Sequence, residues 1–183
     1  FSGTSNKPSK NLAEVTISIM QRQKLKNKLL GYATDFVDLI IDNQKLIKKN
    51  GVKIISNAGG VNPIECAKII KKKLSKSCKL KIGVVYGDDI LKDIEDLIEN
   101  GHNFKNLETG QDINSIKENI TSANVYIDSF SIKDALEKGA DIVLAGRVSD
   151  PGLTLGPLIY EFGWSKIEYN KLASGTLAGH IIE

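Results

Sequence analysis

The sequence predicts an α/β fold with a mostly parallel, Rossmann-like layered sheet and helices on both faces. Short β-branched runs at 52–56, 81–86 and 141–145 are typical of strands. An apolar stripe at helical spacing follows each run. Strands that alternate with helices imply parallel crossover connections. The 183 residues contain no spacer rich in Pro or Ser, so we expect one domain over residues 1–183.

The helices are predicted from apolar spacing and from start and stop residues. Two are expected over 12–28 and 34–49, with Gly31 and Gly51 as their stops. A third should begin at Pro63, with Asn62 as its N-cap. The remaining helices are expected from Ile90 to Gly101, from a cap at Ser131 to Gly139, from Pro151 to Gly163, and over 169–182. Residues 125–127 are predicted as a further strand, and 102–120 as loop with at most a short helix.

Charge and composition argue against nucleic-acid and membrane proteins. The net charge is +3, but only two of the 25 basic residues are arginine, and the lysines of 68–76 fall on a predicted helix without interleaved aromatic residues. We therefore expect a solvated lysine face and no nucleic-acid partner. No apolar run approaches the roughly 20 residues of a membrane span, so no membrane partner is expected.

The cysteines and histidines give no metal or disulfide pattern. Cys66, Cys78, His102 and His180 are scattered along the chain without a zinc-site spacing. We expect no metal site, a reducing compartment and a cytoplasmic location. The cysteines are interpreted as buried filler, and His180 as a partly buried residue with no catalytic role.

Three glycine-bearing corners follow the three predicted strands, and in a parallel sheet such corners meet at one edge, where ligands bind. The first corner contains Asn57, Gly59 and Gly60 before a capped helix. Its glycines could let the backbone approach an anion at the helix N-terminus. They could equally serve a tight turn that needs positive φ, and both interpretations stay open because no named nucleotide motif is present.

The second corner contains Asp88 and Asp89. These carboxylates could act as an acid/base pair or bind a ribose hydroxyl or a cation. Capping of the next helix is the simpler interpretation.

The third corner is Gly146-Arg147 followed by Asp150. No other Lys or Arg occurs from Gly139 to Ser165, so Arg147 is conspicuous in a lysine-rich chain. Its guanidinium fork suits a carboxylate or phosphate, which favours an anion-binding role for Gly146, Arg147 and Asp150. The alternative is a structural pair of Arg147 with Asp150 or Glu161.

Glycine pairs spaced by four, at 152/156 and 175/179, predict close helix packing. Phe162 and Trp164 are expected to pack, or to line an interface.

Several of these segments resemble one family when taken together and in order. They are Leu12–Thr16, Gly31–Phe36, Ser56–Pro63, Gly87–Asp89, Ala140–Val143, Gly146–Val148, Gly156–Trp164 and Leu172–His180. Over Leu12 to Glu183 the chain resembles the acyclic terpene utilisation protein AtuA family. Family members have a longer N-terminal stretch and continue beyond the Ala-Gly-His segment, so we expect the chain to be part of a longer protein.

The resemblance implies a role in the catabolism of acyclic terpenes such as citronellol and geraniol, or of another branched acid, beside acyl-CoA carboxylases and enoyl-CoA hydratases. It fixes no reaction and no cofactor. One hypothesis is an enzyme for a small carboxylate or acyl-CoA, with Asp88 or Asp89 as acid/base and Glu14 as a more distant candidate.

Two further hypotheses stay open. One is a non-catalytic partner or assembly factor of an acyl-CoA-processing complex, or a homo-oligomer, presenting Phe162 and Trp164 at an interface. The other is a nucleotide-binding module. A pocket containing Arg147 would favour ligand binding, whereas an exposed apolar patch around Trp164 would favour the partner.

Overall fold

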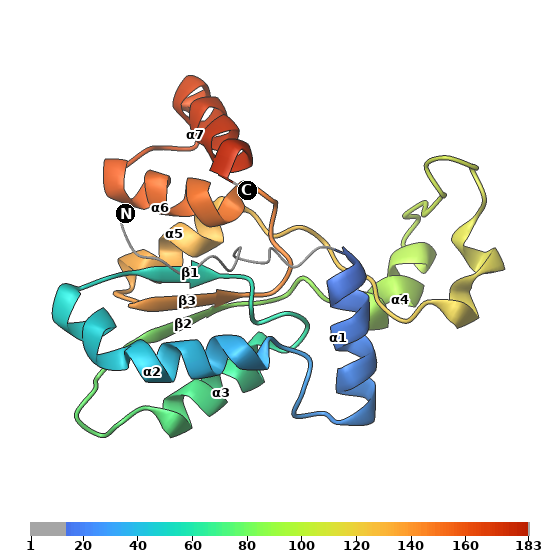
Figure 1. The fold of residues 1–183 in the computed structure, drawn as a ribbon. Helices are drawn as coiled ribbons and strands as arrows, with labels where there is room; N and C mark the ends of the chain where they lie inside the picture. The colour runs from blue at the N-terminus through green and yellow to red at the C-terminus, as the bar shows by residue number, and fades with distance from the viewer. Residues whose placement is uncertain (1–13, 183) are drawn as a thin grey trace.

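The computed structural model describes residues 14–182, whose centre is a three-stranded parallel sheet. The strands are β1 (Ile54–Ser56), β2 (Ile82–Val85) and β3 (Ile142–Ala145), in the order β1-β3-β2. Both pairs are parallel, with β3 in the middle (Figure 1). The predicted strand segments and their parallel arrangement are therefore confirmed.

The helices follow the expected order along the chain. Gly51 and Gly163 end two of them in the left-handed conformation, each at φ 61°. Their bounds are α1 Glu14–Lys26, α2 Thr34–Asn50, α3 Pro63–Lys73, α4 Ile94–Glu99, α5 Ser129–Glu137, α6 Gly152–Phe162 and α7 Tyr169–Ile182. Short 3₁₀ turns cover Leu91–Asp93, Ile113–Ser115 and Lys117–Asn119.

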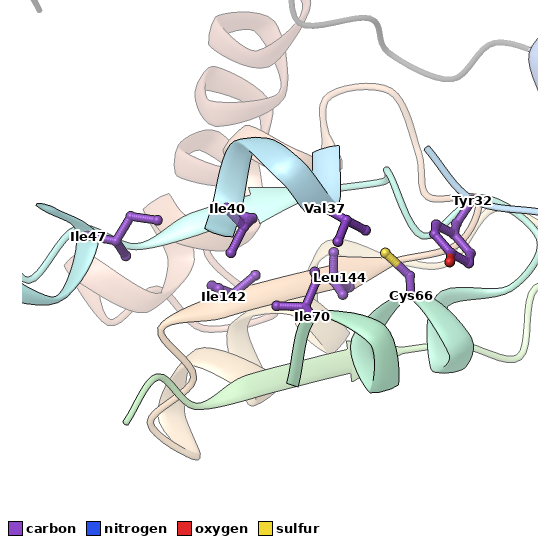
Figure 2. Packing of buried hydrophobic residues seen from close by; sticks show 8 residues of the cluster. All are labelled: Tyr32, Val37, Ile40, Ile47, Cys66, Ile70, Ile142 and Leu144. Carbon is purple, nitrogen blue, oxygen red and sulfur yellow. The ribbon is translucent and has the colours of Figure 1, made fainter. Parts of the chain in front are cut away.

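One face of the sheet packs against α2 and α3. Successive strand residues point to opposite faces, so Ile142 and Leu144 of β3 share this side. Figure 2 shows them facing apolar side chains of the two helices, including Ile40 and Ile70. Cys66 lies in the same cluster with no exposed surface, and burial raises the pKa of its thiol to about 12. This core fixes the central strand against two helices.

The opposite face packs against α5, and α6 packs on α5. Val143 and Ala145 of β3 lie on this side with Ile132 of α5. Gly156 allows α6 to approach closely, since a Cβ there would lie 2.7 Å from the Cβ of Ile132. Gly179 has the same role where α7 meets Pro151 of the α6 entrance. Packing therefore accounts for these glycines, as predicted.

Local capping differs from the predictions in two places. Asn62 stands before α3 but makes no cap bond, because its side-chain amide donates to the carbonyls of Lys28 and Leu30 at 2.9 Å each. The helix expected from Ser131 begins at Ser129, and its cap is Asp128, whose carboxylate accepts the N–H of Ser131 at 3.1 Å. In both places the residue expected as the cap, Asn62 or Ser131, makes hydrogen bonds other than the capping bond that its position predicts.

Two other segments are less regular than predicted. The helix expected from Ile90 begins as a 3₁₀ turn and is regular only over α4. Residues 125–127 do not form a strand. Isolated bridges occur there instead, Ile127 with Val148 within the stretch and Asn124 with Asp89 just before it, so this segment lies beside the strand exits. Within residues 14–182, no helix is long and apolar enough to cross a membrane.

Candidate functional site

Asp88 joins the exits of β2 and β3. Its side chain is buried, with 3% of the residue exposed. Oδ2 accepts the backbone N–H of Arg147 at 2.8 Å and the side-chain amide of Asn124 at 2.8 Å. The backbone carbonyl of Asp88 also accepts the N–H of Val125 at 2.8 Å. We call the edge formed by the carboxyl ends of the strands the rim of the sheet. Asp88 cross-links the chain at this rim through its hydrogen bonds.

Gly146 leaves the space that the Asp88 carboxylate occupies. A Cβ at Gly146 would lie 2.2 Å from Oδ1 and 2.7 Å from Cγ of Asp88. No side chain fits at that distance. The requirement for glycine thus follows from the buried carboxylate, and a direct role of Gly146 in ligand binding stays a prediction.

Arg147 lies inside the same rim, with its side chain 5% exposed. Its Nη2 donates to Oδ1 of Asp150 at 2.9 Å, and the Asp150 side chain is 44% exposed. The guanidinium carbon sits 4.4 Å from the ring centroid of Tyr126, the distance of a cation–π contact. The predicted pairing with Asp150 is present, whereas a contact with Glu161 is not among the interactions of the described residues.

The Asn57–Gly60 loop is buried against the exit of β3. A Cβ at Gly59 would lie 2.6 Å from the carbonyl oxygen of Ala145. Gly60 adopts φ +54°, and a Cβ there would lie 2.5 Å from the sulfur of Met20 in α1. The loop is a close-packed turn, and two independent contacts place all three corners at one rim. Ligand binding by Asn57, Gly59 and Gly60 stays a prediction.

Asp89, the acid next to Asp88, makes contacts of its own. Asp89 is exposed; its Oδ1 accepts the N–H of Leu91 at 3.2 Å, and its Oδ2 lies 3.7 Å from the Lys24 ammonium. The Asp89 side chain therefore supports the first residue of the 3₁₀ turn that precedes α4, while Ile90 holds the cap position. Glu14 begins α1, but its side chain lies outside the described part of the chain.

Asn124 and Tyr126 are rim residues that the sequence did not reveal. Tyr126 lies in the stretch 125–127 that was predicted as a strand, and Asn124 directly precedes it; this segment runs past the exits of β2 and β3. The only signal in the sequence was a tyrosine and an asparagine in a polar region without clear periodicity. Their partners, Asp88 and Arg147, are distant in sequence, so local patterns carry no trace of the contacts.

The structure has a groove of about 770 Å³, but it lies along β2, and none of the predicted site residues lines it. Within residues 14–182, no group of three or more His, Cys, Asp or Glu side chains is arranged to hold a metal ion. The rim is thus a polar cluster around a buried arginine, with Asp150 as its solvent-facing carboxylate.

The profile described as "Acyclic terpene utilisation family protein AtuA" matches residues 9–183. The chain belongs to the AtuA family. The resemblance noted from ordered short segments is therefore confirmed, and Asp88, Gly146 and Arg147 lie within the matched range. Comparison of this AtuA family chain with curated proteins and with solved structures found no match.

Proposed function

We propose that this AtuA family protein binds a carboxylate of acyclic terpenoid or branched-acid catabolism, free or as part of an acyl-CoA, with Arg147 as the group that holds the anion. One observation carries the proposal. The guanidinium is almost completely buried, yet the carboxylate of Asp150 that it binds is 44% exposed. A fixed cation therefore lies directly beneath a carboxylate that faces solvent.

A ligand carboxylate has the charge and shape of the Asp150 side chain and would compete with it for the guanidinium. Tyr126 supports this exchange, because its ring contacts the guanidinium face and restrains its plane. Asp88 holds the backbone N–H of the same residue, so the arginine is anchored at both ends. Such preorganisation lowers the entropy that binding must overcome.

The rim favours binding over acid/base catalysis. The Asp88 carboxylate already accepts two hydrogen bonds from the protein, and the Asp89 carboxylate accepts the N–H of Leu91. Asp88 is buried, and the exposed Asp89 also lies beside the Lys24 ammonium, so neither carboxylate is poised as a general base. A reaction, if the protein performs one, would draw its acid or base from other residues.

Calorimetric titration of the full-length protein tests this proposal. The probes are the carboxylates that correspond to citronellol and geraniol, their CoA thioesters, and ATP as the nucleotide control. Arg147→Lys keeps the charge but loses the fork, so affinity should fall about ten- to a hundredfold. Asp150→Asn removes the competing carboxylate and should preserve or tighten binding.

Two outcomes would contradict the proposal. Equal affinity of wild type and Arg147→Lys would remove Arg147 from the binding site. A loss of thermal stability with binding unchanged would make the Arg147–Asp150 pair purely structural.

A second candidate function, docking of a partner or of another copy, rests on the apolar surface at the end of α6. Phe162 is 65% exposed and stacks on Trp164 with ring centroids 5.6 Å apart. Ile167 and Tyr169 nearby in the chain are also more than two-thirds exposed. An exposed aromatic cluster of this kind is typical of interfaces.

Sedimentation velocity of the full-length protein tests self-association through this surface. Phe162→Ser should shift an oligomer toward monomer, whereas Leu39→Ser, at an exposed apolar site on α2, should not. If the protein is a monomer at all concentrations, the same pair of variants is compared for binding to an acyl-CoA carboxylase, the class of partner that the family resemblance implies. Equal behaviour of both variants in both assays would remove this candidate.

We also propose that the three strands belong to a Rossmann-like layered sheet and that the protein works in the cytoplasm. The parallel strands with helices on each face support the first, and the unbridged Cys66 and Cys78 support the second. A structure of the full-length protein and cell fractionation test them separately.

A further inference from the structure

Among residues 14–182, the strand β2 lies at one edge of the sheet and has a neighbouring strand on one side only (Figure 1). Its carbonyls at Lys81 and Val85 accept N–H groups of Ile142 and Gly146 at 3.1 Å each. Backbone groups alternate in direction along a strand, so those of Ile82 and Val84 face away from β3. Within residues 14–182, no hydrogen bond satisfies them. A strand edge of this kind is a template for another strand.

The groove of about 770 Å³ runs along this free edge. The strand itself forms its floor, and the walls come from α3 and α5. Near Gly83 the groove is lined by the small side chains of Ala135 in α5 and of Ala140, which follows that helix. An added strand would lie about 4.8 Å from β2 and needs a gap of this form between two helices.

The groove is positively charged. Lys71, Lys81 and Lys138 line it against a single acid, Asp134. The Asp134 carboxylate lies 3.6 Å from the ammonium of Lys133. None of the three lysines makes an ion pair with another residue of the described range. The edge therefore combines unused backbone hydrogen bonds with unneutralised cations.

We propose that the edge of β2 binds an extended acidic segment of a partner protein, which adds to the sheet as a further strand. Main-chain hydrogen bonds to Ile82 and Val84 would supply affinity, and the lysines would select acidic sequences. Two other occupants fit less well. Residues 1–13 contain Lys7 and Lys10 and no acidic residue, and a second copy would bring the same lysines to its own β2.

The test uses a blocked, fluorescent peptide, Glu-Glu-Val-Thr-Val-Glu-Glu, titrated into the full-length protein. Binding should protect the Ile82 and Val84 amides from hydrogen exchange. The double variant Lys71→Glu/Lys138→Glu should weaken binding by at least about tenfold, since each reversal replaces attraction by repulsion. Lys72→Glu is the matched control, because Lys72 is exposed on α3 but does not line the groove. The same peptide with alternate amides N-methylated should not bind.

Several results would overturn the proposal. One is binding that survives the double charge reversal or N-methylation, and another is protection at sites other than Ile82 and Val84. A third is a free protein that sediments as a dimer with both amides already protected, which would make a second copy the occupant. A fourth is the absence of peptide binding together with aggregation of the double variant. That result would show that the lysines only prevent the exposed strand edge from associating with other chains.

Discussion

The Asp88 carboxylate accepts the backbone N–H of Arg147 at 2.8 Å and so links two strand exits that are 59 residues apart in the chain. Both partners are buried. The bond fixes where the chain leaves β3, and this position directs the arginine toward Asp150 and Tyr126. The position of the Arg147 guanidinium thus depends on Asp88, which is hydrogen-bonded to the backbone of Arg147 and, within residues 14–182, not to its guanidinium.

Asp88→Ala should destabilise the protein and disturb the rim. The substitution leaves the Arg147 N–H and the Asn124 amide without their acceptor, and a buried donor without a partner costs about 1–3 kcal/mol. Urea unfolding of wild type and variant measures the loss. Asp89→Ala is the control and should cost less than about 1 kcal/mol, because Asp89 is exposed. Equal losses would mean that the hydrogen bonds of Asp88 contribute no more to the free energy of unfolding than the exposed Asp89 does.

Gly146→Ala should be destabilising through a clash with Asp88. The new Cβ would lie 2.2 Å from Oδ1, and overpacking of this kind costs about 1–3 kcal/mol. A double-mutant cycle with Asp88→Ala isolates the cause, since removing the carboxylate removes the clash. The cost of Gly146→Ala should then shrink in the Asp88→Ala background. An unchanged cost would place the strain elsewhere.

Asp141 should contribute stability that is lost in acid. Burial opposes ionisation, but the Lys81 N–H at 2.9 Å and the Lys53 ammonium at 3.1 Å hold the pKa of Asp141 below its usual 3.8. A lowered folded-state pKa means that the stabilisation is present above the unfolded pKa and disappears as pH falls through the folded one.

Urea unfolding of wild type and Asp141→Asn at pH 7, 4 and 3 tests this prediction. The variant should be less stable at pH 7 by up to about 1 kcal/mol, a value reduced for solvent screening. The two proteins should converge as the pH falls below 3.8. A difference that stays constant with pH would show that the carboxylate charge is not responsible.

Cys66 should be inert to thiol reagents while the protein is folded. It has no exposed surface, and a thiol pKa of about 12 leaves only about one thiolate in ten thousand at pH 8. The Cys78→Ser variant isolates this thiol, and its labelling rate should rise sharply in denaturant. Fast labelling without denaturant would show that α2 and α3 open readily over the core.

Neutralising exposed lysines on α3 should change stability little. Lys68, Lys72 and Lys73 are exposed, and only Lys68 and Lys73 make ion pairs, with Glu65 and Asp38. Exchange of all three for glutamine should cost within about 0.5 kcal/mol per site. The variant should also behave like wild type on heparin and DNA columns apart from the reduced charge. Selective, tight nucleic-acid binding lost in the variant would contradict the solvated-face interpretation.

The strands were predictable because β3 is buried on both faces, which requires an uninterrupted apolar run such as Ile142 to Ala145. The prediction that the three corners share one edge of the sheet followed from the expected parallel pairing alone. Hydrogen bonds that join distant segments were not predictable. Asn62 is a good cap by local rules, yet its amide binds carbonyls more than 30 residues earlier.

In the candidate site too, local features were predictable and contacts between distant segments were not. Arg147 was singled out because a lone arginine at a strand exit is unusual in this composition, and its pairing with Asp150 is local at three residues. Tyr126 and Asn124 were missed because their contacts depend on how the 124–127 segment is placed by the fold. Gly146 was noticed, but its physical cause, the Asp88 carboxylate, lies at the end of another strand.

The strand order also governs how the molecule can be assembled during synthesis. Within residues 14–182, β1 and β2 are not paired with each other, and each has its ladder partner in β3, the last of the three strands to be made. Until residue 145 has left the ribosome, the earlier two strands can form helix contacts but not their ladders with β3. A nascent chain stopped before that point would expose two unpaired apolar strands, so chaperone binding should be strongest just before β3 emerges.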